Sequence, residues 1–242
     1  MDSFHNTTIQ SIVSSDYRAA AVFEKYSLDF CCKGGVTVDQ ACSERKVDAG
    51  LVYADLAQLA NEPRENMPHF AEWPIDELVD YIVNVHHRYV REATPLISAH
   101  TQKVAEVHGK NHPEVIAIAR HFEMVAADLT AHMMKEERML FPYFKALVEA
   151  KRSGGAFTPP PFGRAQNPIA IMEAEHQAAG DELYSIRSMS GNYLPPQDAC
   201  TTYRVTFKEL KQFELDLHQH VSLENNILFP KAVALEQELI PM

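Results

Sequence analysis

A segment of eleven residues occurs twice in this chain, and each copy carries a histidine and a glutamate four positions apart. The two copies read His132-Met-Met-Lys-Glu136-Glu-Arg-Met-Leu-Phe-Pro142 and His220-Val-Ser-Leu-Glu224-Asn-Asn-Ile-Leu-Phe-Pro230. In an α-helix, side chains four residues apart lie on the same face, one turn above the other. Each copy therefore presents an imidazole and a carboxylate together as metal ligands. Two such pairs that face each other could hold two metals, with the carboxylates bridging them.

Apolar residues recur at helical spacing on either side of both pairs, so the ligands are predicted to be buried. These residues are Phe122, Val125, Leu129, Leu140 and Tyr143 around the first pair, and Phe213, Leu217 and Leu228 around the second. A carboxylate buried without a partner is costly or takes up a proton, whereas a bound cation neutralises it. A buried His with a Glu that only solvates it would explain one copy, but two copies in register favour a metal site. The proline that closes each copy predicts a local kink.

The composition favours an all-α protein with a sizeable core. The chain has 242 residues, 46% of them hydrophobic, and only 9 glycines. Its net charge of −11 argues against nucleic acid or an anionic membrane as a partner. No apolar run approaches the roughly 18 residues of a membrane span, and the first residues lack the features of a targeting segment, so a cytoplasmic location is expected. The 4 cysteines are too few for a disulfide framework, and reduced thiols are expected.

The chain is predicted to fold as a small N-terminal helical domain followed by an up-down-up-down four-helix bundle. Breaks in the helical pattern place the domain at 1–60, a polar linker with prolines at 61–74 and the bundle at 75–242. In the N-terminal domain, helices are expected over 9–13, 17–26, 38–45 and 49–59, and Asp16, Thr37 and Asp48 are expected to cap the last three. In the bundle, helices are expected over 75–107, 113–150, 168–190 and 197–236. Such bundles build metal sites from side chains that point inward from facing helices.

The first and third predicted helices of the bundle also carry histidines within their buried stripes. His176 lies in the middle of the third helix, and both His86 and His87 fit the stripe of the first, where periodicity does not choose between them. A lone histidine on an apolar stripe is more often an ordinary core residue. In antiparallel helices, however, these histidines would be level with the two pairs, so they are predicted to complete the site. Imidazole with carboxylate fits iron, while zinc, manganese and copper are not excluded.

Other polar residues near the stripes are given lesser roles. Glu175 and Asp128 flank the ligand stripes, and either is a candidate to accept the outer proton of a ligating imidazole. As carboxylates on helices they are otherwise ordinary solvent-facing groups. His218 lies about 200° around its helix from His220, so it is expected to point away from the site and to be solvated.

Two adjacent cysteines form a second feature that could do chemistry. Cys31 and Cys32 lie beside Gly34 and Gly35 between two predicted helices, where both thiols are expected to be accessible. Such a pair could take or deliver iron or carry redox chemistry, or it could fill the core as small apolar side chains. Cys42, inside a predicted helix, is interpreted as a core residue.

These motifs resemble those of the RIC (repair of iron centres) family of haemerythrin-like di-iron proteins, over nearly the whole chain. Asp29-Phe-Cys-Cys32, followed by Gly34 and Gly35, resembles the short cysteine domain at the N-terminus of the family. The segments that resemble its bundle are His132-Met-Met-Lys-Glu136-Glu, Met172-Glu-Ala-Glu-His176 and His220-Val-Ser-Leu-Glu224-Asn-Asn. Lys33 departs from the family pattern, in which glycine follows the cysteines directly, so the details of this loop differ.

The resemblance implies a non-haem di-iron centre with oxo and carboxylate bridges. His87 is preferred over His86 because Arg91-Glu92 follows it. The implied ligands are His87, His132, His176 and His220, with Glu136 and Glu224 bridging the two irons. The implied function is the repair of iron-sulfur proteins damaged by nitric oxide or peroxide, by donation of iron, with Cys31 and Cys32 as candidate transfer or redox thiols. A homodimer is also implied.

Two other functions are compatible with the same centre. Two adjacent irons with an open position could reduce nitric oxide to nitrous oxide, which would make the protein an enzyme. The centre could instead bind nitric oxide or dioxygen as a scavenger or sensor. No G-x-G-x-x-G fingerprint of a nicotinamide or flavin site occurs in the sequence, so electrons for a reductase would come from elsewhere.

Overall fold

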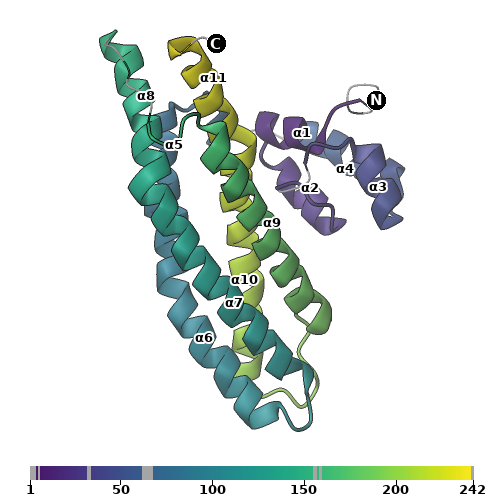
Figure 1. The fold of residues 1–242 in the computed structure, drawn as a ribbon. Helices are drawn as coiled ribbons and strands as arrows, with labels where there is room; N and C mark the ends of the chain where they lie inside the picture. Colours follow the sequence, from purple (N-terminus) through teal and green to yellow (C-terminus); the bar gives the residue numbers. More distant parts are fainter. Residues whose placement is uncertain are drawn as a thin grey trace.

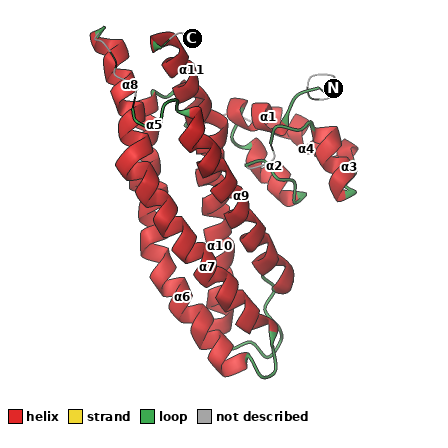
Figure 2. Ribbon diagram, viewed as in Figure 1, coloured by secondary structure: helices red, strands yellow, loops and turns green. Residues whose placement is uncertain are grey.

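A computed structural model describes residues 4, 6–31, 34–61, 68–154, 157 and 160–240 of the chain. Within these residues every regular element is a helix, as Figure 2 shows. Extended backbone pairs only as an isolated bridge between Thr8 and Thr37 in the same described part. The prediction of an all-α protein is confirmed.

Short helices at the N-terminus form a unit beside the bundle (Figure 1). They are α1 (Ile9–Ser15), α2 (Ala19–Lys25), α3 (Val38–Arg45) and α4 (Ala49–Ala60). Thr37 caps α3 as predicted, with Gln40 completing a capping box, and Asp48 caps α4. The second helix begins later than predicted, because Asp16 accepts the backbone N–H of Arg18 at 3.2 Å in a turn that precedes it.

Four long rods run antiparallel to one another and form the up-down-up-down bundle (Figure 1). Three rods contain a π-helical turn, so each of these is built from several segments. Rod 1 consists of α5 (Ile75–Tyr81), η2 (Ile82–His87) and α6 (Arg88–His108); rod 2 of α7 (Glu114–Lys135), η3 (Glu136–Leu140) and α8 (Phe141–Ser153); rod 3 of α9 (Gln166–Met189); and rod 4 of α10 (Thr201–Leu223), η4 (Glu224–Leu228) and α11 (Phe229–Leu239). Each rod begins and ends within a few residues of its predicted range.

The π-helical turns coincide with the candidate ligands. The turn η3 begins at Glu136 and η4 begins at Glu224, while η2 ends at His87. In η3 and η4, the residue before the closing proline donates its N–H to the carbonyl of the glutamate, five residues back. The proline has no N–H with which to continue the α-helical pattern. The irregularity predicted from the prolines therefore takes the form of a π-helical turn, which is common at functional sites.

The candidate ligands form a polar layer that divides the apolar core of the bundle. The core towards the α6–α7 turn includes Phe122, Leu129, Leu183, Phe213 and Leu217, and the core towards α8 and α11 includes Leu78, Phe144, Met172, Leu228 and Phe229. The first of these cores continues without a break into the N-terminal helices, through Ile9, Phe23 and Val52. The N-terminal unit and the bundle therefore share one apolar core.

Charged side chains also join α2 to the bundle. Glu24 accepts from Nδ1 of His218 at 2.9 Å and lies 3.1 Å from Nη2 of Arg187, which in turn binds the buried carboxylate of Glu214. Burial would raise the pKa of Glu24, but His218 and Arg187 outweigh it and lower that pKa. His218 does point away from the candidate ligands, but the expectation that it is solvated is wrong, because its ring also packs edge-on against Phe30.

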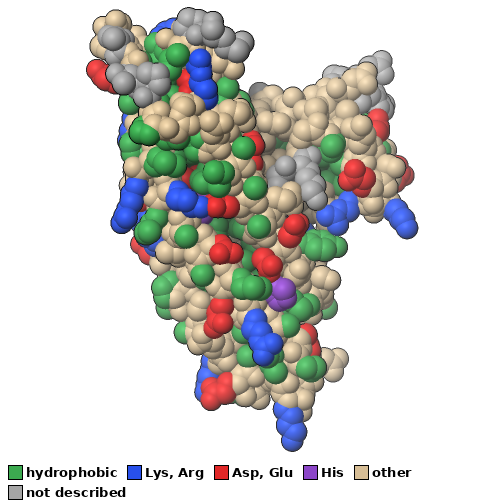
Figure 3. Space-filling model, in the orientation of Figure 1, with side chains coloured by type: hydrophobic (Ala, Val, Ile, Leu, Met, Phe, Trp, Pro, Cys, Tyr) green, Lys and Arg blue, Asp and Glu red, His purple; other side chains and the backbone are tan. Residues whose placement is uncertain are grey.

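The surface carries both signs of charge. On the face drawn in Figure 3, Lys and Arg side chains are scattered among Asp and Glu side chains over the bundle. In the described part of the chain, no helix combines the length and the apolar character needed to cross a membrane.

Candidate metal centre

The six side chains predicted to bind metal meet in the middle of the bundle, and every rod contributes at least one of them. Their donor atoms form two groups, one of His87, Glu136, His220 and Glu224, the other of His132, Glu136, His176 and Glu224. Within each group the donor atoms lie within 4.8 Å of one another. Both glutamates belong to both groups, so the arrangement is that of two adjacent cation positions with shared carboxylates.

The spacing of the donor atoms suits a common cation in each group. Nε2 of His132 lies 2.9 Å from Nε2 of His176, and Nε2 of His87 lies 3.1 Å from Nε2 of His220. Glu224 approaches His220 at 3.0 Å and His176 at 3.1 Å. Two neighbouring ligands of an octahedral metal, each about 2.1 Å from it, are separated by roughly 3 Å. All six side chains are at most 2% exposed, so bulk water does not solvate their charges.

Several polar atoms of these side chains are buried without a hydrogen-bond partner. They are Oε1 and Oε2 of Glu136, Oε2 of Glu224 and Nδ1 of His220, counted among the described residues. Leaving a buried polar atom unpaired costs about 1–3 kcal/mol, and more for a charged group. Carboxylate oxygens that lack hydrogen-bond donors but face imidazole nitrogens fit a bound cation. The donor set of imidazoles and carboxylates is one that suits iron.

The electrostatics of the site favour ionised glutamates. Burial would raise the pKa of both carboxyls, but the surrounding imidazoles outweigh it, and the pKa values of Glu136 and Glu224 are lowered. Burial lowers the pKa of His220. For His132, burial is outweighed by the charges of Glu136 and Glu224, which raise its pKa to about 9. A ligand must be deprotonated, so cation uptake displaces the His132 proton and the affinity rises with pH.

Carboxylates outside the two groups orient two of the imidazoles. Nδ1 of His132 lies 2.8 Å from Oε2 of Glu175, the acceptor that the sequence offered as a candidate. Nδ1 of His87 lies 2.6 Å from Oε1 of Glu137. Asp128, the other sequence candidate, is exposed on α7. Such outer carboxylates fix the ring orientation and make the imidazole a stronger ligand.

The third outer partner is an amide that also reaches the N-terminal unit. Nδ1 of His176 donates to Oδ1 of Asn225 at 2.9 Å, and Nδ2 of Asn225 donates to the backbone carbonyl of Cys31 at 2.9 Å. One side chain therefore connects a candidate ligand to the cysteine loop. Because the amide accepts from the imidazole and donates to the carbonyl, both of its polar ends are satisfied.

Sequence reasoning missed Glu137 and Asn225 as outer partners. Each follows directly after one of the two shared glutamates in the repeated segment. A π-helical turn holds more residues than an α-helical turn, so successive side chains diverge by a smaller angle. A glutamate and the residue after it can then both face the neighbouring rods. The signal available in the sequence was the polar residue at this same position in both copies.

The structure places His87 in the ligand group and His86 beside it. Nδ1 of His86 lies 3.1 Å from Oδ1 of Asp216, and its ring stacks on that of His220 with centroids 5.5 Å apart. His86 is therefore buried against the ring of the candidate ligand His220, while His87 contributes a donor atom to a ligand group.

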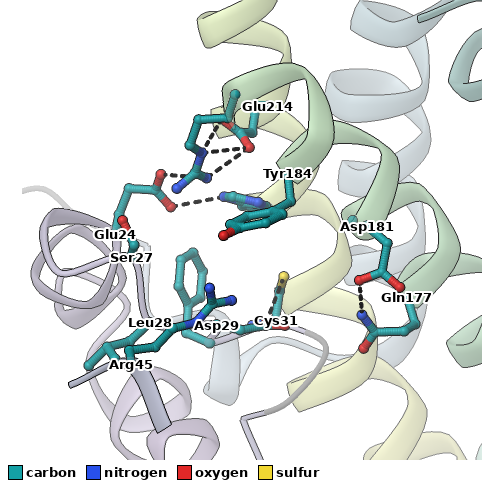
Figure 4. Close-up of a pocket in the computed structure, with 14 residues that line it drawn as sticks. Glu24, Ser27, Leu28, Asp29, Cys31, Arg45, Gln177, Asp181, Tyr184 and Glu214 are labelled. Carbon is teal, nitrogen blue, oxygen red and sulfur yellow. Dashed lines mark hydrogen bonds and ion pairs between the residues drawn. The ribbon is translucent and has the colours of Figure 1, made fainter. Parts of the chain in front are cut away.

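Cys31 lines a pocket of about 200 Å³ between the N-terminal helices and the bundle helices α9 and α10 (Figure 4). Its Sγ lies 3.5 Å from Oδ1 of Asp29. Only 6% of Cys31 is exposed, so the expectation of an accessible thiol is wrong for this residue. Cys32, the other residue of that prediction, lies outside the described residues. Cys42 is buried in α3, as predicted.

Two family models match the sequence. Residues 78–232 match the haemerythrin HHE cation binding domain, and residues 5–60 match ScdA_N, a domain of unknown function. The first match covers both shared glutamates and all four candidate histidine ligands. The fold and the site thus define a haemerythrin-like, cation-binding protein.

Relatives that align over almost the full length extend this classification to the whole chain. The iron-sulfur cluster repair protein YtfE of Citrobacter koseri is 35% identical over 237 residues, which span 97% of this chain and all of that protein. Proteins with the same name from an Enterobacter species and from Escherichia coli O81 are 34% and 33% identical over the same spans. The chain therefore belongs to the haemerythrin-like family of iron-sulfur cluster repair proteins, as its motifs predicted.

The outer carboxylates give a direct test of the centre. Replacing Glu175 or Glu137 with alanine should weaken iron binding about 10- to 100-fold, because an unrestrained imidazole is a poorer ligand. Asp128→Ala removes an exposed carboxylate from rod 2, the rod of Glu137, without touching a candidate ligand and serves as the control. Iron affinity measured by competition with a chelator decides the outcome. Equal iron affinities in Glu175→Ala and Asp128→Ala would contradict the assignment of Glu175 as the residue that orients a metal-binding imidazole.

Proposed function

We propose that this protein repairs damaged iron-sulfur clusters by delivering iron from a di-iron centre. The proposed ligands are His87, His132, His176 and His220, with Glu136 and Glu224 shared between the two irons and an oxo bridge completing the centre. The observation that carries the proposal is the pair of buried ligand groups with common carboxylates, in a chain whose relatives are named iron-sulfur cluster repair proteins. Damaged iron-sulfur proteins are the proposed targets.

The donor set supports release of the metal as well as binding. Four imidazoles are neutral ligands, and two carboxylates supply a charge of −2 against +4 for two ferrous ions. Such a site holds iron less tightly than one crowded with carboxylates, because the protein's own side chains neutralise only half of the cation charge. In this proposal iron is the cargo. The protein contributes oriented ligands and a dry interior that excludes competing ligands.

Contacts between the N-terminal unit and the bundle suggest how the release of iron is controlled. Residues 1–60 act in this proposal as the cysteine-bearing domain, 61–74 as a linker and 75–242 as the iron-holding bundle. Asn225 restrains His176 and the Cys31 carbonyl at once. Displacement of the Cys31 loop by a client protein would remove this restraint, and an imidazole without its outer hydrogen bond binds metal less tightly. Contact with a client would therefore loosen one ligand of the centre.

Transfer of labelled iron tests the proposal. Protein loaded with isotopically labelled iron is mixed under anaerobic conditions with a dehydratase whose cluster has lost iron. Labelled iron should enter the cluster and restore activity faster than the same concentration of free ferrous iron. A Glu224→Ala variant, which loses a shared ligand, should transfer little. A rate no greater than that of free ferrous iron would overturn delivery as the function.

Cys31 is expected to contribute to transfer rather than to storage. Cys31→Ser should slow iron transfer several-fold without lowering the iron content, because the side chain lies between the bundle and the N-terminal unit but outside both ligand groups. Cys200→Ser, which removes an exposed thiol elsewhere, is the control. Iron content by metal analysis and transfer rate by the labelled assay are compared. Unchanged transfer in Cys31→Ser would remove this cysteine from the proposal.

The burial of the centre favours a second candidate function, the reduction of nitric oxide. The ligand side chains are almost wholly inaccessible, which admits a diatomic gas more readily than a protein thiol. Two ferrous ions would supply the two electrons with which two molecules of nitric oxide and two protons give nitrous oxide and water. Nitrous oxide measured from the reduced protein under excess nitric oxide should reach one molecule per centre if this function holds. Binding of nitric oxide without nitrous oxide would indicate a scavenger or sensor instead.

A further inference from the structure

A second cluster of metal-ligating side chains lies at the opposite end of the bundle from α8 and α11. Two interhelical segments meet there, the turn that joins α6 to α7 and the segment that leads into α10 (Figure 1). The cluster is made by His108, His112, Asp198 and Cys200. None of these residues belongs to the two ligand groups in the middle of the bundle.

The four side chains form two close pairs. Nε2 of His108 lies 3.2 Å from Sγ of Cys200, and Nε2 of His112 lies 3.0 Å from Oδ2 of Asp198. Two ligands of one tetrahedral zinc ion are separated by roughly 3.4–3.6 Å when the metal bonds are 2.0–2.3 Å long. Each pair therefore already has nearly the separation that a shared cation requires.

The surroundings of His112 resemble those of the ligands in the central site. Its Nδ1 lies 3.3 Å from Oε1 of Glu114, while its Nε2 faces the carboxylate of Asp198. His132 shows the same division of roles, since its Nδ1 meets the outer carboxylate of Glu175 and its Nε2 faces the other donors. An acceptor on the outer nitrogen fixes the ring with its inner nitrogen directed at a metal.

The two pairs are close enough to be drawn together. The rings of His108 and His112 have centroids 6.4 Å apart, and the ring of Tyr203 packs against both. The donor atoms are not gathered at one point in this structure. Asp198 and Cys200 are both exposed, however, so rotation of their side chains meets little packing resistance.

We propose that His108, His112, Asp198 and Cys200 bind one zinc ion at the far end of the bundle. Imidazole, thiolate and carboxylate are all ligands that tetrahedral zinc accepts, and the thiolate favours zinc over the harder cations. The ion would tie the α6–α7 turn to the segment before α10. This role is independent of iron delivery and goes beyond the proposed function.

Zinc binding to the iron-loaded, full-length protein tests the proposal. After incubation with zinc and removal of excess metal, about one zinc per chain should remain with the iron content unchanged. Cys200→Ser and His112→Ala should each bind zinc at least about tenfold more weakly, because losing a ligand costs no less than losing an outer partner. His100→Ala is the control, since His100 pairs with Glu209 on the same bundle but lies outside the cluster.

Cobalt and heat provide independent readouts. Cobalt in place of zinc should give a thiolate-to-cobalt charge-transfer absorption that Cys200→Ser abolishes. Zinc should raise the thermal midpoint of the iron-loaded protein but not that of Cys200→Ser, because a ligand stabilises only the state that binds it. Three results would overturn the assignment: no retained zinc, zinc that appears only as iron is lost, or zinc affinity unaffected by Cys200→Ser and His112→Ala.

Discussion

The burial of two carboxylates in the middle of a helical bundle is the constraint on which the rest of this structure depends. Glu136 and Glu224 are fully inaccessible and keep lowered pKa values, so the fold must surround two negative charges with positive or hydrogen-bonding groups. Imidazoles from all four rods do this, and the two groups of donor atoms fit a cation that would complete the neutralisation. The apolar core is consequently split into two parts by a polar layer, and each part packs independently on its own side of the ligands.

Much of the fold and of the candidate site could be predicted from the sequence, because the apolar stripes and the ligand spacing are both periodic. The repeated segment placed His132, Glu136, His220 and Glu224 on buried faces, and the structure brings them together. Helical periodicity could not decide whether His87 or the adjacent His86 is the metal ligand. Both side chains are buried, both lie in the π-helical turn that ends at His87, and only His87 contributes a donor atom to a ligand group.

What the sequence did not reveal lies in contacts between distant segments. The burial of Cys31 and the pairing of His218 with Glu24 both depend on how the N-terminal unit packs against the bundle, which no local pattern encodes. Loop composition indicated an accessible thiol because glycines follow it. The backbone of Cys31 is instead held against rod 4 by Asn225, a residue whose polarity alone gives no hint of its partner.

The π-helical turns also restrict which insertions and deletions this chain can accept. Removing one residue from η3 or η4 would restore a regular α-helix, in which successive side chains diverge by about 100°. The wider turn accommodates the extra residue, so the helix beyond it would keep nearly the same orientation. The apolar face of α8 or α11 would stay on the core, but the glutamate and the residue after it could no longer both face the neighbouring rods. Chain length inside these turns is therefore as restricted as the identity of the ligands, whereas the loops between rods are free of that restriction.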